Sequence, residues 1–111
     1  MRSIGYCTYD PSASPRSTDF ALSSQERSFA DYCQRKGHNL LAVFADSQGE
    51  STRTSFTEMI QYIEREKTSF LVLVHRPEHL GMTLEKAVEA VLNVDRLGSQ
   101  VVSTDDELPD P

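Results

Sequence analysis

Ser69-Phe70-Leu71-Val72-Leu73-Val74 is the stretch of sequence that decides the fold. Large apolar residues follow one another from Phe70 to Val74 without a polar interruption, over the length of a single β-strand. Such a run is typical of a strand at the centre of a parallel sheet, where helices cover both faces. The rest of the chain should therefore supply the neighbouring strands and the covering helices.

Three other segments have the pattern of strands. Residues 4–9 place apolar or small side chains on both faces, residues 39–45 are mostly apolar, and Val101-Val102 mark a short fourth strand. Residues 10–22 contain two prolines and no period, which indicates a loop.

Three helices are expected between the strands, each from a capping signal and an apolar stripe. The first should begin in the capping box Ser23-x-x-Glu26 and end at Gly37, and the second has Ser55-x-x-Glu58 as its cap. The third should run from near Thr83 to Gly98. The side chains expected to face the sheet are Phe29, Ala30, Tyr32 and Cys33; Phe56, Met59, Ile60 and Ile63; and Leu84, Val88, Val91 and Leu92.

Alternating strands and helices predict an α/β fold with three layers, α/β/α, around a mainly parallel sheet of four to five strands. We expect one domain over residues 1–104 and an acidic flexible tail over 105–111. Ligand sites in such sheets lie beyond the carboxyl ends of the strands. The informative loops are therefore 9–22, 46–54, 75–83 and the segment after 103.

Size and charge exclude several classes of protein. The chain of 111 residues suits one domain, and its net charge of −6, from 11 Lys plus Arg against 17 Asp plus Glu, is unfavourable for tight DNA binding. A membrane-spanning apolar stretch and a secretory signal are not apparent. Cys7 and Cys33 lack metal-site spacing and are expected to be buried reduced thiols, which suits a cytoplasmic location.

Six phrases lie at the ends of the expected elements: Ile4-Gly5-Tyr6, Ser24-Gln25-Glu26-Arg27, Tyr32-Cys33-Gln34-Arg35-Lys36-Gly37, Val43-Phe44-Ala45-Asp46, Arg53-Thr54-Ser55-Phe56 and Leu80-Gly81. In this order, over nearly the whole chain, they resemble the catalytic domain of serine recombinases (resolvases and invertases). The resemblance implies a resolvase-like fold and metal-free phosphoryl transfer. A serine after the first strand would attack a DNA phosphate, and arginines from several loops would stabilise the phosphoryl oxygens.

The first-strand motif of that family, Tyr-x-Arg-x-Ser, falls on residues 6–10 of this chain. Thr8 stands where the family has an arginine, and Asp10 stands where it has the nucleophile. A carboxylate at that position would bring negative charge toward a phosphodiester. The resemblance therefore implies a chain without the usual nucleophile.

The motif after the third strand, Asp-Arg-Leu-Gly-Arg, falls on residues 78–82. Glu78 replaces the aspartate, and His79 and Met82 replace the two arginines. The remaining matches to active-site positions of the family are Gln25, Asp46 and Arg53, the last across a deletion in the segment 46–54.

Losing one oxyanion donor typically reduces a rate by about 10²–10³, and here three arginines and the nucleophile differ together. We therefore predict a pseudoenzyme that does not cut DNA. One alternative is an active recombinase with a relocated serine, Ser12, Ser14 or Ser17, with Arg16 near; the simpler interpretation of these residues is a solvated linker. Another is a phosphate- or small-molecule-binding module that uses the same loops.

Two other motifs point to chemistries that we weigh lower. The segment from His75 to His79 has the His-x-x-Glu-His spacing of certain zinc peptidases, but Pro77 disfavours the continuous helix that this site needs. Asp46 at a strand end suggests a receiver domain, yet the acidic pair of receivers is missing after the first strand. The glycines are scattered, so no phosphate loop is expected.

No cofactor and no metal are expected. In the family, a long dimerising helix and a DNA-binding module follow the catalytic domain, whereas this sequence ends in the acidic stretch 105–111. It is therefore either a part of a longer recombinase or a free-standing domain. The expected partners are another protein or a second copy in a homodimer, with DNA bound weakly if at all and no membrane.

Overall fold

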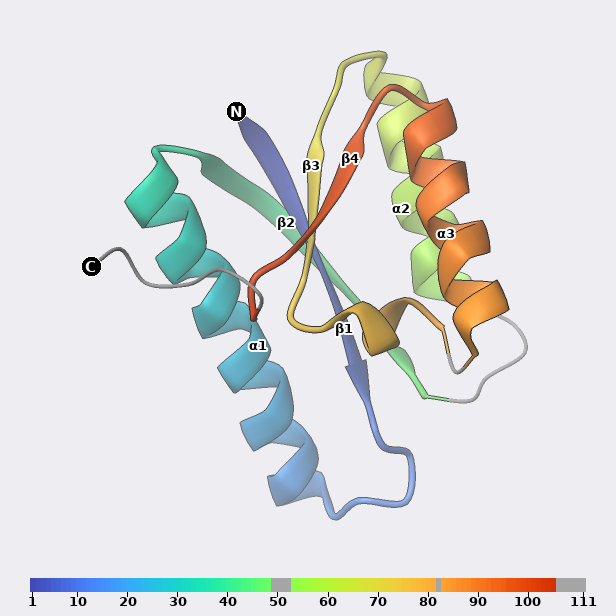
Figure 1. Cartoon of the computed structure of the whole chain (residues 1–111). Coiled ribbons are helices and arrows are strands. Elements are labelled where there is room, and N and C mark those ends of the chain that lie inside the picture. The colour runs from blue at the N-terminus through green and yellow to red at the C-terminus, as the bar shows by residue number, and fades with distance from the viewer. Residues whose placement is uncertain (49–52, 82, 106–111) are drawn as a thin grey trace.

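Four parallel strands form the sheet of this chain, whose computed structural model describes residues 1–48, 53–81 and 83–105. They are β1 (Arg2–Tyr9), β2 (Asn39–Ser47), β3 (Leu71–Val74) and β4 (Gln100–Ser103), in the order β2-β1-β3-β4. Every strand of the sheet points the same way, so all carboxyl ends meet at one edge (Figure 1). The predicted parallel α/β fold is confirmed.

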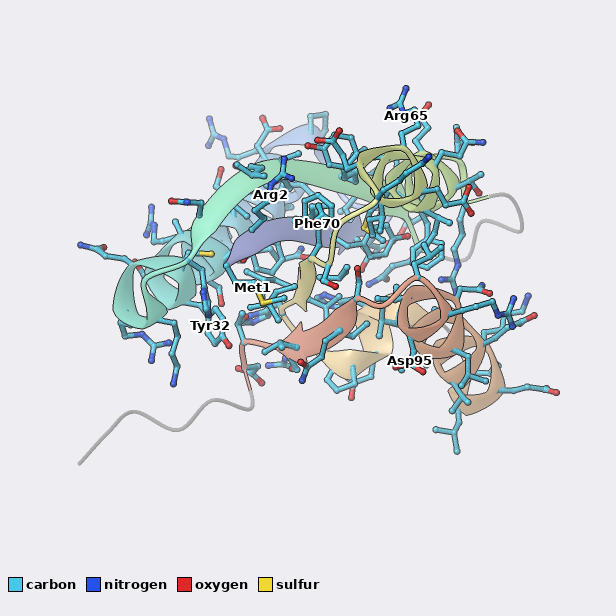
Figure 2. All side chains as sticks on the ribbon, turned by 90° about the horizontal axis from the view of Figure 1, so that it is seen from above. Met1, Arg2, Tyr32, Arg65, Phe70 and Asp95 are labelled. Carbon is cyan, nitrogen blue, oxygen red and sulfur yellow. The ribbon has the colours of Figure 1, made fainter. Side chains whose placement is uncertain are left out.

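Within these described ranges, three α-helices cover the sheet: α1 (Pro15–Lys36), α2 (Thr54–Glu66) and α3 (Leu84–Arg96). A short 3₁₀ helix, η1 (Pro77–Leu80), follows β3. Helix α1 lies on one face of the sheet, while α2 and α3 lie on the other (Figure 2). The fold therefore has the three layers that the alternation predicted.

Side-chain alternation along β1 divides the core in two. Ile4 and Tyr6 pack in the cluster that includes Phe56 and Met59 of α2, whereas Cys7 packs with Phe29 of α1. Successive strand residues point to opposite faces, so both faces of β1 are buried as expected. Thr8, two residues after Tyr6, consequently faces the side of α2 and α3.

The apolar run from Phe70 to Val74 lies at the buried centre of the sheet. All four residues of β3 are buried, between β1 and β4. At the amino edge of the sheet, the Arg2 guanidinium lies 5.0 Å from the centroid of the Phe70 ring and donates to Glu66 Oε1 at 3.1 Å (Figure 2). This closes the end of the core that is remote from the candidate site.

The predicted start of the first helix is wrong. Helix α1 begins at Pro15 rather than Ser23, and the Ser14 hydroxyl accepts from the amide of Ser17 as the N-cap. Proline suits the first position of a helix, where its missing N–H has no intrahelical role. The proline that suggested a loop therefore starts the helix, and much of the expected loop 10–22 is helical. Gly37 ends the helix as predicted, with φ 73°.

The cap of α2 also differs from the prediction. Arg53 occupies the N-cap position without a side-chain capping bond, and the expected Ser55-x-x-Glu58 box is replaced by Asp46. The Asp46 carboxylate accepts from the amides of Ser55 and Phe56, each at 2.9 Å. A carboxylate brought from β2 thus satisfies the free donors of the first turn. The predicted inner face of α2 is confirmed, with Phe56, Met59 and Ile63 buried.

The predicted inner face of α3 is wrong. Leu84, Val88, Val91 and Leu92 are exposed, and Leu84 retains 82% of its accessible surface. Ala90 and Val94 are buried instead, with Ala87 and Leu97 packed against the same core. Both stripes have helical spacing, so periodicity alone does not choose between them. The stripe that packs on the sheet begins with Ala87 and Ala90, whose small side chains allow the helix to lie close to the sheet.

The two cysteines are buried free thiols, as predicted. Burial raises the pKa of Cys7 to about 12, with a smaller contribution from Glu26. Among the helices of the described part, none is long and apolar enough to cross a membrane. The predicted flexible tail lies largely outside the described residues, which end at residue 105.

Candidate functional site

A cavity of about 900 Å³ opens at the carboxyl edge of the sheet. The end of β2, the start of α2, η1 and the first turn of α3 surround it. The described residues that line this pocket are Tyr6, Thr8, Ser47, Gln48, Arg53, Arg76, Pro77, Glu78, His79, Gly81, Thr83, Leu84, Lys86 and Ala87. This is the edge where parallel sheets place their ligands.

Thr8 belongs to the pocket lining and is 93% buried, with 7% of its surface exposed. Strand β3 ends its pairing at Tyr6, so the backbone of Thr8 has no strand partner on that side. Gln25 replaces the strand: its Oε1 accepts from the Thr8 amide at 3.2 Å, and its Nε2 donates to the Thr8 carbonyl at 2.8 Å. Gln25 therefore holds the backbone of Thr8 and does not reach the pocket lining.

The Thr8 hydroxyl is different, because it is buried and has no hydrogen-bond partner among the described residues. A buried hydroxyl without a partner costs roughly 1–3 kcal/mol. It therefore favours a site that a ligand or solvent completes.

Asp46 serves the helix beside the pocket and is absent from its lining. It is 5% exposed, and Tyr6 Oη donates to its Oδ2 at 2.7 Å, in addition to the two amides of α2. With these three donors the carboxylate is fully engaged in structure. This geometry does not suit the phospho-acceptor aspartate of a receiver domain, which has to be accessible.

Asp10 and the neighbouring serines form a turn of their own outside the pocket. Asp10 Oδ1 accepts from the Ser12 hydroxyl at 2.7 Å and from the Ser12 amide at 2.9 Å. These bonds lower the pKa of the Asp10 carboxyl. Ser14 caps α1 by accepting from the Ser17 amide, and the Ser14 hydroxyl donates to Ser17 Oγ at 3.0 Å within the same first turn. The three serines are therefore partners of local structure.

The segment from His75 to His79 bends after β3 and enters η1, so it is not the continuous helix of a zinc-peptidase motif. The two imidazole rings have centroids 6.1 Å apart. Within the described ranges, no three His, Cys, Asp or Glu side chains are placed to hold a metal ion.

His79 contributes a second buried polar atom to the pocket. Its Nδ1 has no hydrogen-bond partner in the described part of the chain. Burial lowers the pKa of His79, and the neighbouring His75 and Arg76 lower it further, against an opposing effect of Glu78. The neutral imidazole is thus favoured.

In the described part of the chain, three cations border the same cavity: Arg53, Arg76 and Lys86. The Arg53 guanidinium lies 5.5 Å from the centroid of the Phe56 ring. Arg53 and Lys86 also border a smaller hollow of about 230 Å³ between α2 and α3. Arg53 immediately precedes α2 and Lys86 lies in the first turn of α3, so the two cations border the same surface from different elements.

The structure brings some of the predicted site residues together and separates the others. Thr8, Arg53, Glu78 and His79 line one pocket, while Asp10, Gln25 and Asp46 lie outside its lining. Met82 lies outside the described residues. No sequence motif pointed to Arg76 or Lys86 as site residues, although Arg76 falls in the loop 75–83, where a ligand site was expected.

Solved structures similar to this chain include catalytic domains of an integrase and of an IS607-like serine recombinase, and a resolvase-family site-specific recombinase. The N-terminal catalytic domain of TP901-1 integrase superposes with a TM-score of 0.78 at 16% identity, over 96% of this chain and 78% of that one. The C-terminal catalytic domain of ISC1926 TnpA, an IS607-like serine recombinase, gives 0.77 at 16% identity, over 99% and 71%. A resolvase-family site-specific recombinase from Streptococcus pneumoniae gives 0.73 at 15% identity, over 96% and 74%.

These likenesses establish the fold class, and a family model identifies the chain more closely. The model of the resolvase N-terminal domain matches residues 12–111. The chain therefore belongs to the resolvase family, as its motifs suggested. A search among curated proteins found no match.

Proposed function

We propose that this resolvase-family domain is catalytically inactive and acts as a protein-interaction or regulatory module in DNA recombination or processing. The observation that carries the proposal is the separation of the candidate nucleophiles from the cationic pocket. Asp10, Ser12, Ser14 and Ser17 are absent from the pocket lining and hydrogen-bond within their own turn.

The electrostatics agree with this proposal. Attack on a phosphate needs an unengaged nucleophilic hydroxyl and cations around the phosphoryl oxygens at the same site. Among the described lining residues, Arg53 is the only cation of the family pattern that is retained, with Thr8 and His79 at arginine positions. Asp10 at the nucleophile position carries a negative charge that repels a phosphodiester.

A covalent-adduct assay tests the inactive state. The chain is incubated with a pool of nicked duplexes of random sequence, and adducts are sought on denaturing gels and by mass spectrometry. We expect none. Ser12→Ala, Ser14→Ala and Ser17→Ala test the serines of the turn, and Ser47→Ala tests the one serine among the described lining residues. An adduct lost in any one of these variants would establish an active recombinase with a relocated serine.

The interaction role is supported by the exposed apolar stripe of α3, formed by Leu84, Val88, Val91 and Leu92. A helical stripe of this kind can pair with its own copy across a twofold axis, since the same residues then serve both partners. We therefore propose a homodimer through α3. Sedimentation should show a dimer that Leu92→Glu dissociates, whereas Phe20→Glu, at another exposed apolar residue, should leave it intact. A monomer at every concentration would contradict the homodimer.

A further inference from the structure

The pocket at the carboxyl edge is positively charged in a chain that is acidic overall. Among the described residues, its lining holds three cations, Arg53, Arg76 and Lys86, and one carboxylate, Glu78. The whole chain has a net charge of −6. A concave surface with low-dielectric walls concentrates the field of its charges. The local excess of positive charge therefore opposes the overall charge and selects an anion.

Two buried polar atoms point independently to a ligand. Thr8 Oγ1 and His79 Nδ1 both belong to lining residues, and both lack a hydrogen-bond partner among the residues that the structure describes. Buried polar atoms in proteins are nearly always paired. A hydroxyl donates to an anion's oxygen, and an imidazole nitrogen can exchange a hydrogen bond with a protonated oxygen or a ribose hydroxyl.

We propose that this pocket binds a phosphomonoester, with Arg53, Arg76 and Lys86 around the phosphate and Thr8 Oγ1 donating to it. A phosphomonoester carries between one and two negative charges at neutral pH and three terminal oxygens. The three cations and the threonine hydroxyl match this demand for several donors around one group. The remaining volume of the cavity, about 900 Å³ in all, accommodates a nucleotide-sized body.

This inference rests on the proposed function, because a pocket engaged in strand cleavage would hold an internal phosphodiester instead. Arg76 and Lys86 lie outside the five-residue motifs that map onto Tyr6–Asp10 and Glu78–Met82. A phosphodiester has one negative charge and two non-bridging oxygens, so it leaves part of this donor set unused. The donor set of this chain therefore favours the monoester.

The existing partner of Arg76 does not prevent binding. Arg76 Nε lies 3.5 Å from Asp105 Oδ2, with both side chains about half exposed. An exposed pair of this kind contributes about 0–1 kcal/mol and is screened by salt. A phosphate with three cationic partners can compete with it.

Calorimetric titration of the full chain with AMP tests the proposal, with inorganic phosphate and adenosine as parallel probes. AMP and phosphate should bind and adenosine should not. Lys86→Gln and Arg76→Gln should each weaken AMP binding about tenfold, the loss of one charge-assisted contact. Arg65→Gln, an exposed arginine of α2 outside the pocket lining, is the matched control and should leave the affinity unchanged.

Three results would overturn the inference: no binding of AMP or phosphate at about 10 mM, far above ordinary ligand affinities; equal affinity in the Lys86→Gln and Arg76→Gln variants; or adenosine binding as tightly as AMP. The dinucleotide TpT separates the two proposals. If TpT binds as tightly as AMP, the monoester inference fails, while the inactive state is decided separately by the adduct assay.

Discussion

The turn at residues 10–17 and the pocket at the end of β2 lie at the same edge of the sheet but differ in their hydrogen bonding. In the turn, Asp10, Ser12 and Ser14 bond one another or the local backbone. In the pocket, Thr8 Oγ1 and His79 Nδ1 are buried without partners in the described chain. Polar groups with hydrogen-bond partners within the chain stabilise local structure, whereas buried polar groups without a partner favour a site that a ligand completes. A ligand is therefore expected in the cationic pocket and not at the serines of the turn.

The largest expected effect is on stability, and it distinguishes Asp46, beside the pocket, from Asp10, in the turn. Asp46→Ala should lower the free energy of unfolding by about 3 kcal/mol, because three buried or partly buried donors lose their acceptor and α2 loses its cap. Urea denaturation measures this change. Asp10→Ala is the matched control and should leave the midpoint nearly unchanged, since Asp10 is exposed. Equal losses of stability in the two variants would contradict the structural role assigned to Asp46.

A smaller effect is expected within the turn. Ser14→Ala should cost about 1 kcal/mol, because the amide of Ser17 loses its capping acceptor. Ser12→Ala should cost less, since Ser12 contacts only an exposed carboxylate at the surface. Thermal unfolding compares the two serines directly. A larger loss for Ser12 would contradict the capping role assigned to Ser14.

His79, a residue of the pocket lining, should contribute to the pH dependence of stability. The folded-state pKa of His79 is lowered, mainly by burial, so the unfolded chain takes up the proton more readily. The contribution of the neutral ring is present above the unfolded-state pKa, about 6.5, and is lost as the pH falls below it. Denaturation at pH 7.5 and 5.5 should show a smaller loss in His79→Gln than in the original chain. An unchanged loss would assign the pH dependence to other groups.

The smallest effect on stability is expected for Thr8→Val, which replaces an unpartnered hydroxyl by a methyl group of similar shape. Because no described hydrogen bond is lost, the free energy of unfolding should change by less than about 1 kcal/mol, in either direction. AMP binding should nevertheless weaken several-fold. A loss of about 2 kcal/mol or more in the free energy of unfolding would mean that the Thr8 hydroxyl has a structural partner. Thr8 would then have a structural role, as Asp46 does.

Much of the fold followed from local patterns. The apolar run at 69–74 predicted the buried central strand, and Gly37 predicted the end of α1. The start of α1 was missed because prolines were interpreted as loop residues, although Pro15 fits the first helical position. The face of α3 was missed because two apolar stripes compete on one helix. Local chemistry allows both arrangements in each case.

The candidate site was partly predictable. Family motifs led to Thr8, Arg53, Glu78 and His79, which line one pocket. They did not lead to Arg76 and Lys86, because a surface cation has no local signature that distinguishes a ligand contact from ordinary solvation. Nor did they reveal that Asp46 is engaged by α2 and Tyr6, since these donors come from distant parts of the chain.

The sequence by itself determined the α/β class, the parallel sheet and membership of the resolvase family, because periodicity and ordered motifs are properties of neighbouring residues. Only the tertiary structure decided which polar groups have hydrogen-bond partners within the described chain and which do not. Hydrogen bonds across 10 to 40 residues, such as those of Asp46 to Phe56 and to Tyr6, exist only when separate elements meet. For the same reason, Arg53, Arg76 and Lys86 form one cationic surface only after α2, η1 and α3 have packed at the same edge of the sheet.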